Sequence, residues 1–314
     1  GNVAPAPSIT GAPETSPEGT EISLGSAVSD PGALDTQTLA WKVTKDGQDY
    51  ASGSGQDFQF TPADNGSYQV TLTATDKDGS ASETATITIV PIPQVPTDYL
   101  ARWCLDGDTL DETGRHHGIP KGAVTYAPGK AGQAIVGPQG YVAIPPSPEI
   151  DSLPALTVAA WVKPSADSAA NKPIFTLYTG EGDRIYIRVD SNQAVRVFNN
   201  INKTGLGHNS ASIAHLIGTW FFVAWTYSPS GVSQIYINGQ PSGDAENYSL
   251  PLSELVTGAT CLIGYEPFMQ TGFGGSIDDV MLFDRALQPD EIRALYESPG
   301  VILPTLDPLP DAAV

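Results

Sequence analysis

The sequence predicts an all-β protein of two domains, and three observations indicate this. The 314 residues include 32 glycines and 27 prolines, which break the chain into short segments. Between these turn residues lie runs of Val, Ile and Thr with period-2 alternation, as in ETATITIV at 83–90, and this period is typical of half-buried strands. The length suits about two domains, each with a sizeable core.

The charge of the chain excludes two classes of partner. With 15 basic and 35 acidic residues, the net charge is -20, so the chain cannot neutralise a run of nucleic-acid phosphates. The same charge disfavours an anionic membrane surface, and no apolar stretch approaches the ~20 residues that span a bilayer. Because the chain begins at Gly1 without an initiator Met, we expect a segment of a longer protein. Its acidity, few lysines and Pro-rich joints suit an exported protein.

A proline-rich joint predicts the division between the domains. PIPQVPTD, at 91–98, carries three prolines and follows a period-2 run, which favours an extended linker. We therefore assign 1–95 to a first domain, 96–298 to a second domain and 299–314 to a Pro-rich linker.

Strand-like runs in the first domain follow one another at the spacing of a β-sandwich. We expect Trp41 to anchor its core and Tyr68 to form a tyrosine corner, with its hydroxyl bonded to nearby backbone. AWKVTKDG and FTPADNGSYQVTLTATDKDG resemble a bacterial PKD or immunoglobulin-like repeat, and this resemblance covers nearly all of 1–95. We expect a spacer rather than a binding domain. The acids of DKDG, at 76–79, either cap a hairpin or hold calcium.

The second domain shows about ten strand-like runs and no long helix between them, the pattern of a large jelly roll. At its end, PDEIRALYE predicts a short helix with Pro289 in the first turn and Ile292, Leu295 and Tyr296 on one face. Three tryptophans in or beside alternating apolar strands are expected in the core: Trp161, Trp220 and Trp225.

Three stretches of this domain, taken in order, resemble the LamG-like, concanavalin A-like lectin/glucanase jelly roll. They are LARWCLDGDTLDETGRHHG, GTWFFVAWTYSPSGVSQIYINGQ and GSIDDVMLFDRALQPDEIRALYE. The expected fold is thus an immunoglobulin-like β-sandwich followed by a concanavalin A-like β-jelly-roll sandwich. The resemblance implies carbohydrate binding or adhesion, with a structural calcium ion, in secreted or cell-surface bacterial proteins. Its expected partners are a polysaccharide or glycoconjugate and other modules of the same polypeptide.

Acidic residues at both ends of this domain predict the calcium site. Asp106 ends the first strand, and the turn after it supplies Asp111, the free carbonyls that follow Gly114, and His117. Adjacent strand residues point to opposite faces, so one acid of the pair Asp278–Asp279 should face the core and need a partner. The resemblance places the first acid of IDD, Asp278, beside Asp106. In the alternative interpretation, the acids of the turn are caps and Asp278 is an edge charge.

The acids and histidines of this domain also decide whether the sequence predicts catalysis. A glycosidase needs two carboxylates about 5–10 Å apart in an open cleft. EGDRIY, at 181–186, lacks the third acid of the usual glucanase run, and the four histidines form no metal motif. We therefore expect a binding module rather than an enzyme. A polysaccharide hydrolase or lyase, or a purely architectural module, is the alternative.

A concentration of cations and aromatics predicts the sugar site. Sugars bind to flat aromatic rings and to planar polar side chains. The cations could bind an anionic polysaccharide through bidentate contacts, or they could pair with surplus acids. Phe268 could lie beneath its own loop. The candidate ligands are Arg184, Tyr186, Arg188, Arg196 and Asn199, bordered by Tyr265 and Phe268.

Two cysteines, Cys104 and Cys261, lie too far apart in the sequence for a zinc-type pair. They form either one long-range disulfide or two buried thiols, and the sequence leaves both alternatives open.

Overall fold

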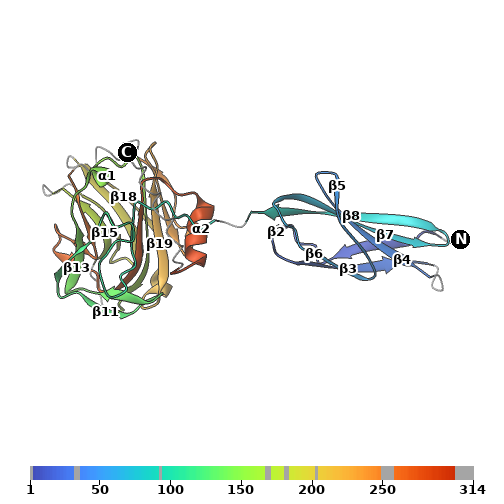
Figure 1. Ribbon diagram of the computed structural model, residues 1–314, viewed down its shortest axis with the longest axis horizontal. Helices are drawn as coiled ribbons and strands as arrows, with labels where there is room; N and C mark the ends of the chain where they lie inside the picture. Colours follow the sequence, from blue (N-terminus) through green and yellow to red (C-terminus); the bar gives the residue numbers. More distant parts are fainter. Residues whose placement is uncertain are drawn as a thin grey trace, which may run out of the picture. The chain divides into compact units, whose positions relative to one another are not determined.

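The computed structural model describes residues 3–31, 36–91, 94–166, 171–179, 184–201, 204–248 and 258–300. The chain divides into two compact units, Gly1–Ile92 and Pro93–Val314, so the division falls within the predicted joint (Figure 1). Most of the predicted linker at 299–314 lies outside the described residues.

The first unit is a small sandwich of two sheets, in the orders β1-β3-β6 and β2-β8-β7-β4-β5. Its strands are β1 (Ala6–Thr10), β2 (Thr15–Pro17), β3 (Ile22–Ser29), β4 (Thr38–Lys45), β5 (Gln48–Ser54), β6 (Asp57–Phe60), β7 (Gly66–Asp76) and β8 (Gly79–Val90). Trp41 is buried, as predicted, and Tyr68 is also buried and donates its hydroxyl to the Asp64 carbonyl at 2.9 Å. The predicted tyrosine corner is therefore confirmed. Asp76 accepts the amides of Asp78 and Gly79, which supports the hairpin-cap interpretation of DKDG.

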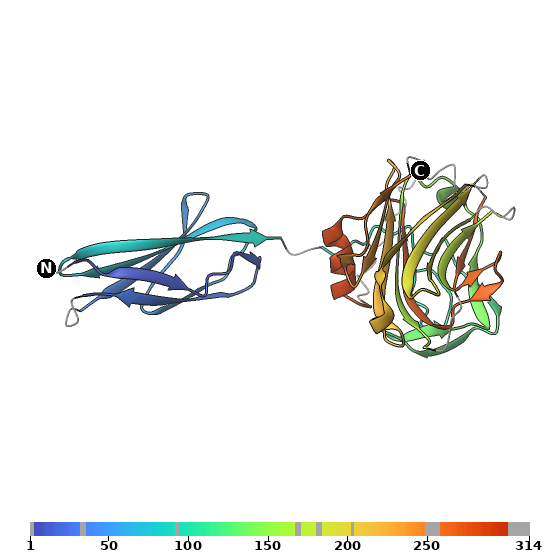
Figure 2. The same ribbon diagram turned by 180° about the vertical axis from the view of Figure 1, so that it is seen from behind.

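The second unit is a jelly roll of two large sheets, in the orders β10-β13-β23-β15-β16-β17-β18 and β11-β12-β26-β14-β19-β20-β21 (Figures 1 and 2). Strand β9 pairs with β26, and β22 pairs with β20. Its first elements are β9 (Ala101–Trp103), β10 (Ile119–Gly122), β11 (Thr125–Pro128), β12 (Gln133–Val136), β13 (Gly140–Ile144), α1 (Pro148–Asp151), β14 (Leu156–Pro164), β15 (Lys172–Tyr178), β16 (Arg184–Val189), β17 (Ala194–Ile201) and β18 (Thr204–Ser212). The later elements are the 3-10 helix η1 (Ala214–Leu216), β19 (Phe221–Tyr227), β20 (Val232–Ile237), β21 (Gln240–Pro241), β22 (Glu246–Asn247), β23 (Thr260–Ile263), β24 (Tyr265–Glu266), β25 (Thr271–Gly272), β26 (Gly275–Phe283) and α2 (Pro289–Glu297).

Two hydrophobic cores stabilise this unit. The larger core lies between the two sheets and contains Trp225. The smaller core lies on the other side of the nine-stranded sheet, where Trp161 packs with Ile292 and Leu295 of α2. Helix α2 begins with Pro289 in its first turn, as its sequence predicted, and it also has a capping box. Trp220 is only partly buried, against this smaller core.

A β-bulge interrupts β26 beside β14. Trp161 pairs with Asp278 and Ala159 pairs with Met281, so β26 has one residue more than β14 in this interval. Asp279 lies in the bulge with a left-handed φ of +48°. Asp278 therefore lies on the same side of the sheet as Trp161.

The bulge corrects one prediction about the two acids. Ile277 and Val280, three residues apart, both point into the larger core, so the usual alternation is shifted by one residue. Asp279 forms an ion pair with Arg102 (Nε–Oδ1 2.7 Å), which lies between two core residues of β9 and so faces outward. The prediction that one acid faces the core is wrong for the larger core, because both acids lie on the other side of the nine-stranded sheet, the side of the smaller core, where both are buried.

Candidate functional site

The outer side of the seven-stranded sheet carries a layer of arginine and aromatic side chains. On β16, Ile185, Ile187 and Val189 point into the larger core, so Arg184, Tyr186 and Arg188 point outward. On β17, Arg196 and Phe198 face the same side, because they pair with Arg188 and Tyr186. The Tyr186 and Phe198 rings stack with their centroids 5.3 Å apart, and the Arg188 and Arg196 guanidiniums lie 4.7 Å and 5.5 Å from these two rings.

The loop between β24 and β25 folds over this layer. The Glu266 side chain is fully buried, forms an ion pair with Arg184 (Nε–Oε1 3.2 Å) and accepts the amides of Phe268 and Met269. These contacts hold the Phe268 ring 4.0 Å from the Arg184 guanidinium. The Phe268 side chain is 62% exposed, so its predicted alternative position beneath the loop is wrong.

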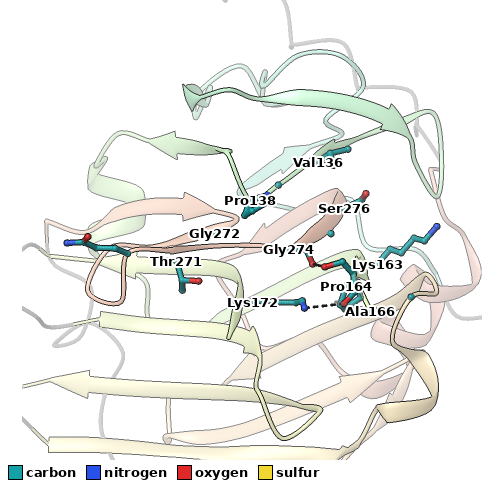
Figure 3. A pocket seen from close by; sticks show the side chains of 15 residues that line it. Val136, Pro138, Lys163, Pro164, Ala166, Lys172, Thr271, Gly272, Gly274 and Ser276 are labelled. Atoms are coloured by element: carbon teal, nitrogen blue, oxygen red, sulfur yellow. Dashed lines mark hydrogen bonds between the residues drawn. The ribbon is translucent and has the colours of Figure 1, made fainter. Parts of the chain in front are cut away.

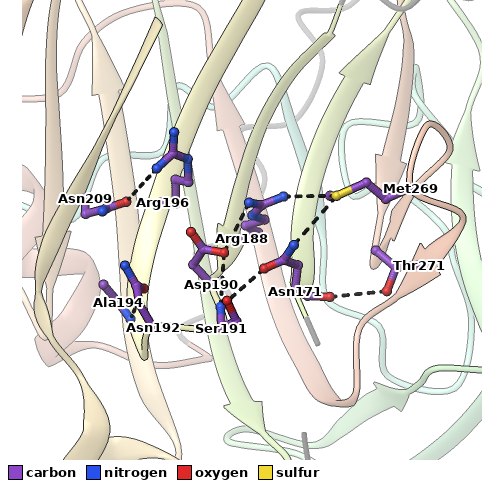
Figure 4. A network of polar contacts seen from close by, with 10 residues as sticks. All are labelled: Asn171, Arg188, Asp190, Ser191, Asn192, Ala194, Arg196, Asn209, Met269 and Thr271. Carbon is purple, nitrogen blue, oxygen red and sulfur yellow. Dashed lines mark hydrogen bonds and ion pairs between the residues drawn. The ribbon is translucent and has the colours of Figure 1, made fainter. Parts of the chain in front are cut away.

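Most of the predicted cations serve as supports below this surface. Arg184 and Arg188 are buried, and Arg188 contacts Asp190 at 3.1 Å and the Met269 sulfur at 3.3 Å (Figure 4). Arg196 is partly exposed and reaches Asn209 at 3.5 Å. The surface that a ligand can touch is therefore Phe268, Phe198, Arg196 and Asn209, which we call the Phe268 platform.

Two of the predicted ligands lie elsewhere. Asn199 pairs with Ile185 and points inward with it, is 2% exposed, and has no hydrogen bond on its side-chain nitrogen or oxygen. The prediction that Asn199 lies on the ligand face was wrong. Its side chain points to the same side of β17 as the core residues, which alternate with the outward-facing ones. Tyr265 is partly exposed and stacks on Tyr141 of β13, with centroids 4.3 Å apart, toward the other end of the sheet.

Asp106 and Asp278 are the first and the last of the predicted calcium ligands in the sequence, and both bind the loop at 129–133. Asp278 Oδ2 accepts the amides of Lys130 (2.7 Å) and Ala131 (3.0 Å), and Asp106 accepts the amide of Gln133. Burial raises the pKa of Asp278 to about 7 against these hydrogen bonds, and the negative charges of Asp279 and Asp106 add to the rise.

Glycines make this loop fit the two acids. A Cβ at Gly129 would lie 2.5 Å from Asp278 Oδ2, and one at Gly132, where φ is +53°, would clash with Asp106. No residue of this loop was among the predicted site residues. Its signal was the pair of glycines in PGKAGQAI, a stretch conspicuous only for its turn residues.

The other predicted calcium ligands form a separate cluster. Asp111 accepts the amides of Arg102, Thr113, Arg115 and His116 and the hydroxyl of Thr113. Burial acts to raise its pKa, but these hydrogen bonds outweigh burial and lower it. Because its lone pairs are taken by its own turn, Asp111 acts as a cap and fits calcium poorly.

His117 and Gly114 belong to the same turn. His117 Nδ1 accepts the amide of Asp111 at 3.0 Å, and Gly114 turns the chain with φ of +75°. The five predicted ligands are thus divided between two clusters. Within the part of the chain that the structure describes, no group of three or more His, Cys, Asp or Glu side chains could hold a metal.

Calcium can also be coordinated by carbonyl and amide oxygens, and a group of His, Cys, Asp and Glu side chains does not include these ligands. Asp278 is a buried acid with two acidic neighbours, so a cation beside it and Asp106 suits its chemistry. These two acids are the residues that could hold calcium.

Of the two alternatives for the cysteines, the structure does not support the disulfide. Cys104 and Cys261 are free thiols. Trp103 fills the larger core, so Cys104 beside it faces outward and donates to Glu112 at 3.2 Å, whereas Cys261 points into the core from the opposite sheet. Burial raises the pKa of both thiols, which makes them unreactive.

Two acids of the predicted catalytic alternatives, Asp278 and Asp279, are described, and each has partners of its own. Residues 181–183 of EGDRIY lie outside the described residues. Asp278 is covered by its loop, and Asp279 is bound by Arg102 through both carboxylate oxygens. His208, which donates to or accepts from the Tyr248 hydroxyl at 2.7 Å, has its pKa lowered to about 4, chiefly by burial.

Comparison with known proteins follows the same division of the chain. Residues 136–293, half of the sequence, match the model of the Concanavalin A-like lectin/glucanases superfamily, and residues 2–90 match that of the PKD domain. A rat (Rattus norvegicus) protein, "Sushi, von Willebrand factor type A, EGF and pentraxin domain-containing protein 1", is 27% identical over 175 residues, and the match covers 52% of this chain and only 5% of that protein.

Two solved structures show the same fold at low identity. Domain 4 of AbnA, an extracellular arabinanase from Geobacillus stearothermophilus in complex with arabinotriose, has a TM-score of 0.51 and 21% identity, with 63% of this chain and 98% of that chain covered. The binding domain of botulinum neurotoxin DC in complex with SialylT has a TM-score of 0.50 and 17% identity, with 65% and 52% covered. The described residues contain no helix long and apolar enough to cross a membrane. The chain therefore belongs to the Concanavalin A-like lectin/glucanases superfamily, and a PKD domain precedes its jelly roll.

Proposed function

We propose that the jelly roll binds carbohydrate on the Phe268 platform without catalysing a reaction. The observation that carries this proposal is the exposed Phe268 ring, which is held above Arg184 by a loop fixed through Glu266. A large exposed aromatic on a fixed loop is typical of a binding surface rather than of a core.

The platform supplies the chemistry that sugars need. The Phe268 and Phe198 rings offer flat apolar surfaces for the CH face of a pyranose, and Arg196 and Asn209 offer planar donors and an acceptor for its hydroxyls. Because the buried arginines fix the rings before binding, little entropy is lost on association. The guanidinium of Arg196 also favours a glycan that carries carboxylate or sulfate groups.

Two proteins that share the fold support this proposal. One is an arabinanase domain in complex with arabinotriose, and the other is a toxin binding domain in complex with SialylT. At 21% and 17% identity, they support the class of ligand and leave the particular sugar open.

The absence of turnover rests on the placement of the described acids. Glu266 is fully buried against Arg184, and Asp278 is 1% exposed beneath its loop. Neither could flank a sugar in an open cleft, as glycoside hydrolysis requires. The competing functions are a polysaccharide hydrolase or lyase and an architectural contact module.

We also infer that Asp106 and Asp278 hold a structural calcium ion. The ion would neutralise a buried acid whose neighbours are also negative, and it would fix the loop at 129–133. The proposed setting of the chain is a secreted or cell-surface bacterial protein, in which the PKD domain acts as a spacer between modules.

A glycan array tests the proposed function. The wild type should bind a subset of glycans, and Phe268→Ala with Arg196→Ala should lose that binding. Leu110→Ala, which truncates another exposed apolar side chain in the turn at 106–118, should bind as the wild type does. Absence of wild-type binding to every glycan would favour the architectural function, and release of shortened products from a bound polysaccharide would favour an enzyme.

A further inference from the structure

A cavity of about 690 Å³ lies in the jelly roll, and neither ring of the Phe268 platform lines it (Figure 3). Its walls come from the turn between β12 and β13, the ends of β14 and β25, and the starts of β15 and β26. A volume in the range of about 300–1,000 Å³ is typical of small-molecule sites. The cavity therefore has room for a monosaccharide or a disaccharide.

The lining of this cavity is basic in a strongly acidic chain. Lys163 and Lys172 both line it, although the whole sequence has only 15 basic residues, and the described lining contains no carboxylate. Lys172 is 3% exposed, and its amine donates to the Ser165 carbonyl at 3.1 Å. Lys163 is exposed at the rim and forms no ion pair with any described residue.

The remaining lining combines hydroxyls and glycines with four apolar side chains, those of Val136, Pro138, Pro164 and Ala166. Ser165, Thr271 and Ser276 supply hydroxyls, and five glycines leave backbone groups accessible: Gly137, Gly218, Gly272, Gly274 and Gly275. A Cβ at Gly274 would lie 3.1 Å from Ser165 Oγ and 3.5 Å from Lys172 Cε, so the glycine leaves space beside the buried amine. The described lining contains no aromatic ring. A ligand here would be held by charge and hydrogen bonds rather than by stacking.

We propose that this cavity binds a sugar that carries a carboxylate or sulfate group. The two amines select the anion, and the hydroxyls and backbone groups select the sugar hydroxyls. This site goes beyond the proposed function, because none of the four platform residues lines it. The two proposals can therefore fail separately.

Isothermal titration with sodium glucuronate, glucose 6-sulfate, glucose and acetate tests the proposal. Glucuronate or glucose 6-sulfate should bind the wild type at least tenfold more tightly than glucose, which lacks the charge, or acetate, which lacks the sugar. Lys163→Gln and Lys172→Met should each weaken the binding about tenfold. Added salt should weaken it too.

Lys121→Gln is the matched control, since it removes one exposed lysine from β10, outside the lining. It should leave the affinity unchanged, and so should Phe268→Ala, which tests the platform separately. If Lys172→Met does not fold, Lys163→Gln still decides, because Lys163 is exposed. The proposal is overturned if neither anionic sugar binds, if glucose or acetate binds equally well, if Lys163→Gln has no effect, or if Phe268→Ala abolishes binding.

Discussion

Asp278 is a buried acid with acidic neighbours, and it is also a candidate calcium ligand. Its side chain is 1% exposed, and burial raises its pKa from the usual 3.8 to about 7. Two backbone amides of the loop at 129–133 oppose the rise, and the charges of Asp279 and Asp106 add to it. Without a bound cation, the folded protein therefore favours the protonated form of this acid at pH values below about 7.

This shift predicts the sign of a pH dependence. Between about pH 4 and pH 7, folded Asp278 keeps a proton that the unfolded chain releases, so the free energy of unfolding should fall as pH rises. The fall should level off above pH 7 and amount to at most about 4 kcal/mol. Urea unfolding in the presence of a chelator, at a series of pH values, measures it.

Asp278→Asn is the isosteric control for this prediction, because its amide oxygen can still accept from the loop. The variant should lose the fall between pH 4 and pH 7 relative to the wild type. Parallel curves for the two proteins would contradict the raised pKa.

The buried ion pair of Arg102 and Asp279 gives a second prediction for individual residues. Both side chains are buried and their contacts are bidentate, with Nε–Oδ1 at 2.7 Å and a nitrogen–Oδ2 distance of 3.2 Å. Arg102→Met should cost about 3–5 kcal/mol of unfolding free energy, because it leaves a buried carboxylate without this partner. Adding Asp279→Asn should recover part of the loss, as a double-mutant cycle would measure. A loss below about 1 kcal/mol in the single variant would show that this pair contributes little.

At the scale of elements, local patterns in the sequence predicted some features and long-range pairing decided others. Alternation and turn residues predicted the tyrosine corner, and the helix signals around Pro289 predicted α2. The bulge in β26 could not be predicted, because it exists only in the pairing with β14, more than 100 residues earlier in the chain. Asp278 consequently lies on the outer side of its sheet, where the loop at 129–133 covers it.

The candidate ligand face shows the same limit. Alternation correctly placed Arg184, Tyr186 and Arg188 on one side of β16. It could not show that the loop from β24 covers two of them, since this depends on the contact between Glu266 and Arg184 across distant segments.

That contact predicts how the loop between β24 and β25 behaves. Glu266→Gln removes the charge that pairs with Arg184, so the loop should open more often and the unfolding free energy should fall by about 1–3 kcal/mol. Hydrogen exchange at the Phe268 and Met269 amides should become faster. Glu246→Gln, which removes an exposed acid from β22, should leave these amides unchanged. Equal exchange in the two variants would show that Glu266 does not hold the loop.

At the scale of the whole molecule, the two compact units should respond differently to calcium. Both candidate ligands, Asp106 and Asp278, lie in the second unit. Removal of calcium by a chelator should lower the melting temperature of the second unit only, because binding to the folded state stabilises it by about 2.7 kcal/mol at a hundredfold excess over Kd. Calorimetry of the whole chain measures both transitions. Superimposable scans with calcium and with chelator would contradict the proposed calcium site.

The central claim, glycan binding by the Phe268 platform without turnover, is tested most directly by one titration. The oligosaccharide that binds most strongly on the array is titrated into the wild type and into Phe268→Ala, and the ligand is recovered afterwards for chromatography. Because Phe268 is 62% exposed, its truncation should leave the fold intact. We predict at least a tenfold weaker affinity for Phe268→Ala and an oligosaccharide recovered at its original length. Equal affinity for both proteins, or a shortened oligosaccharide, would contradict the claim.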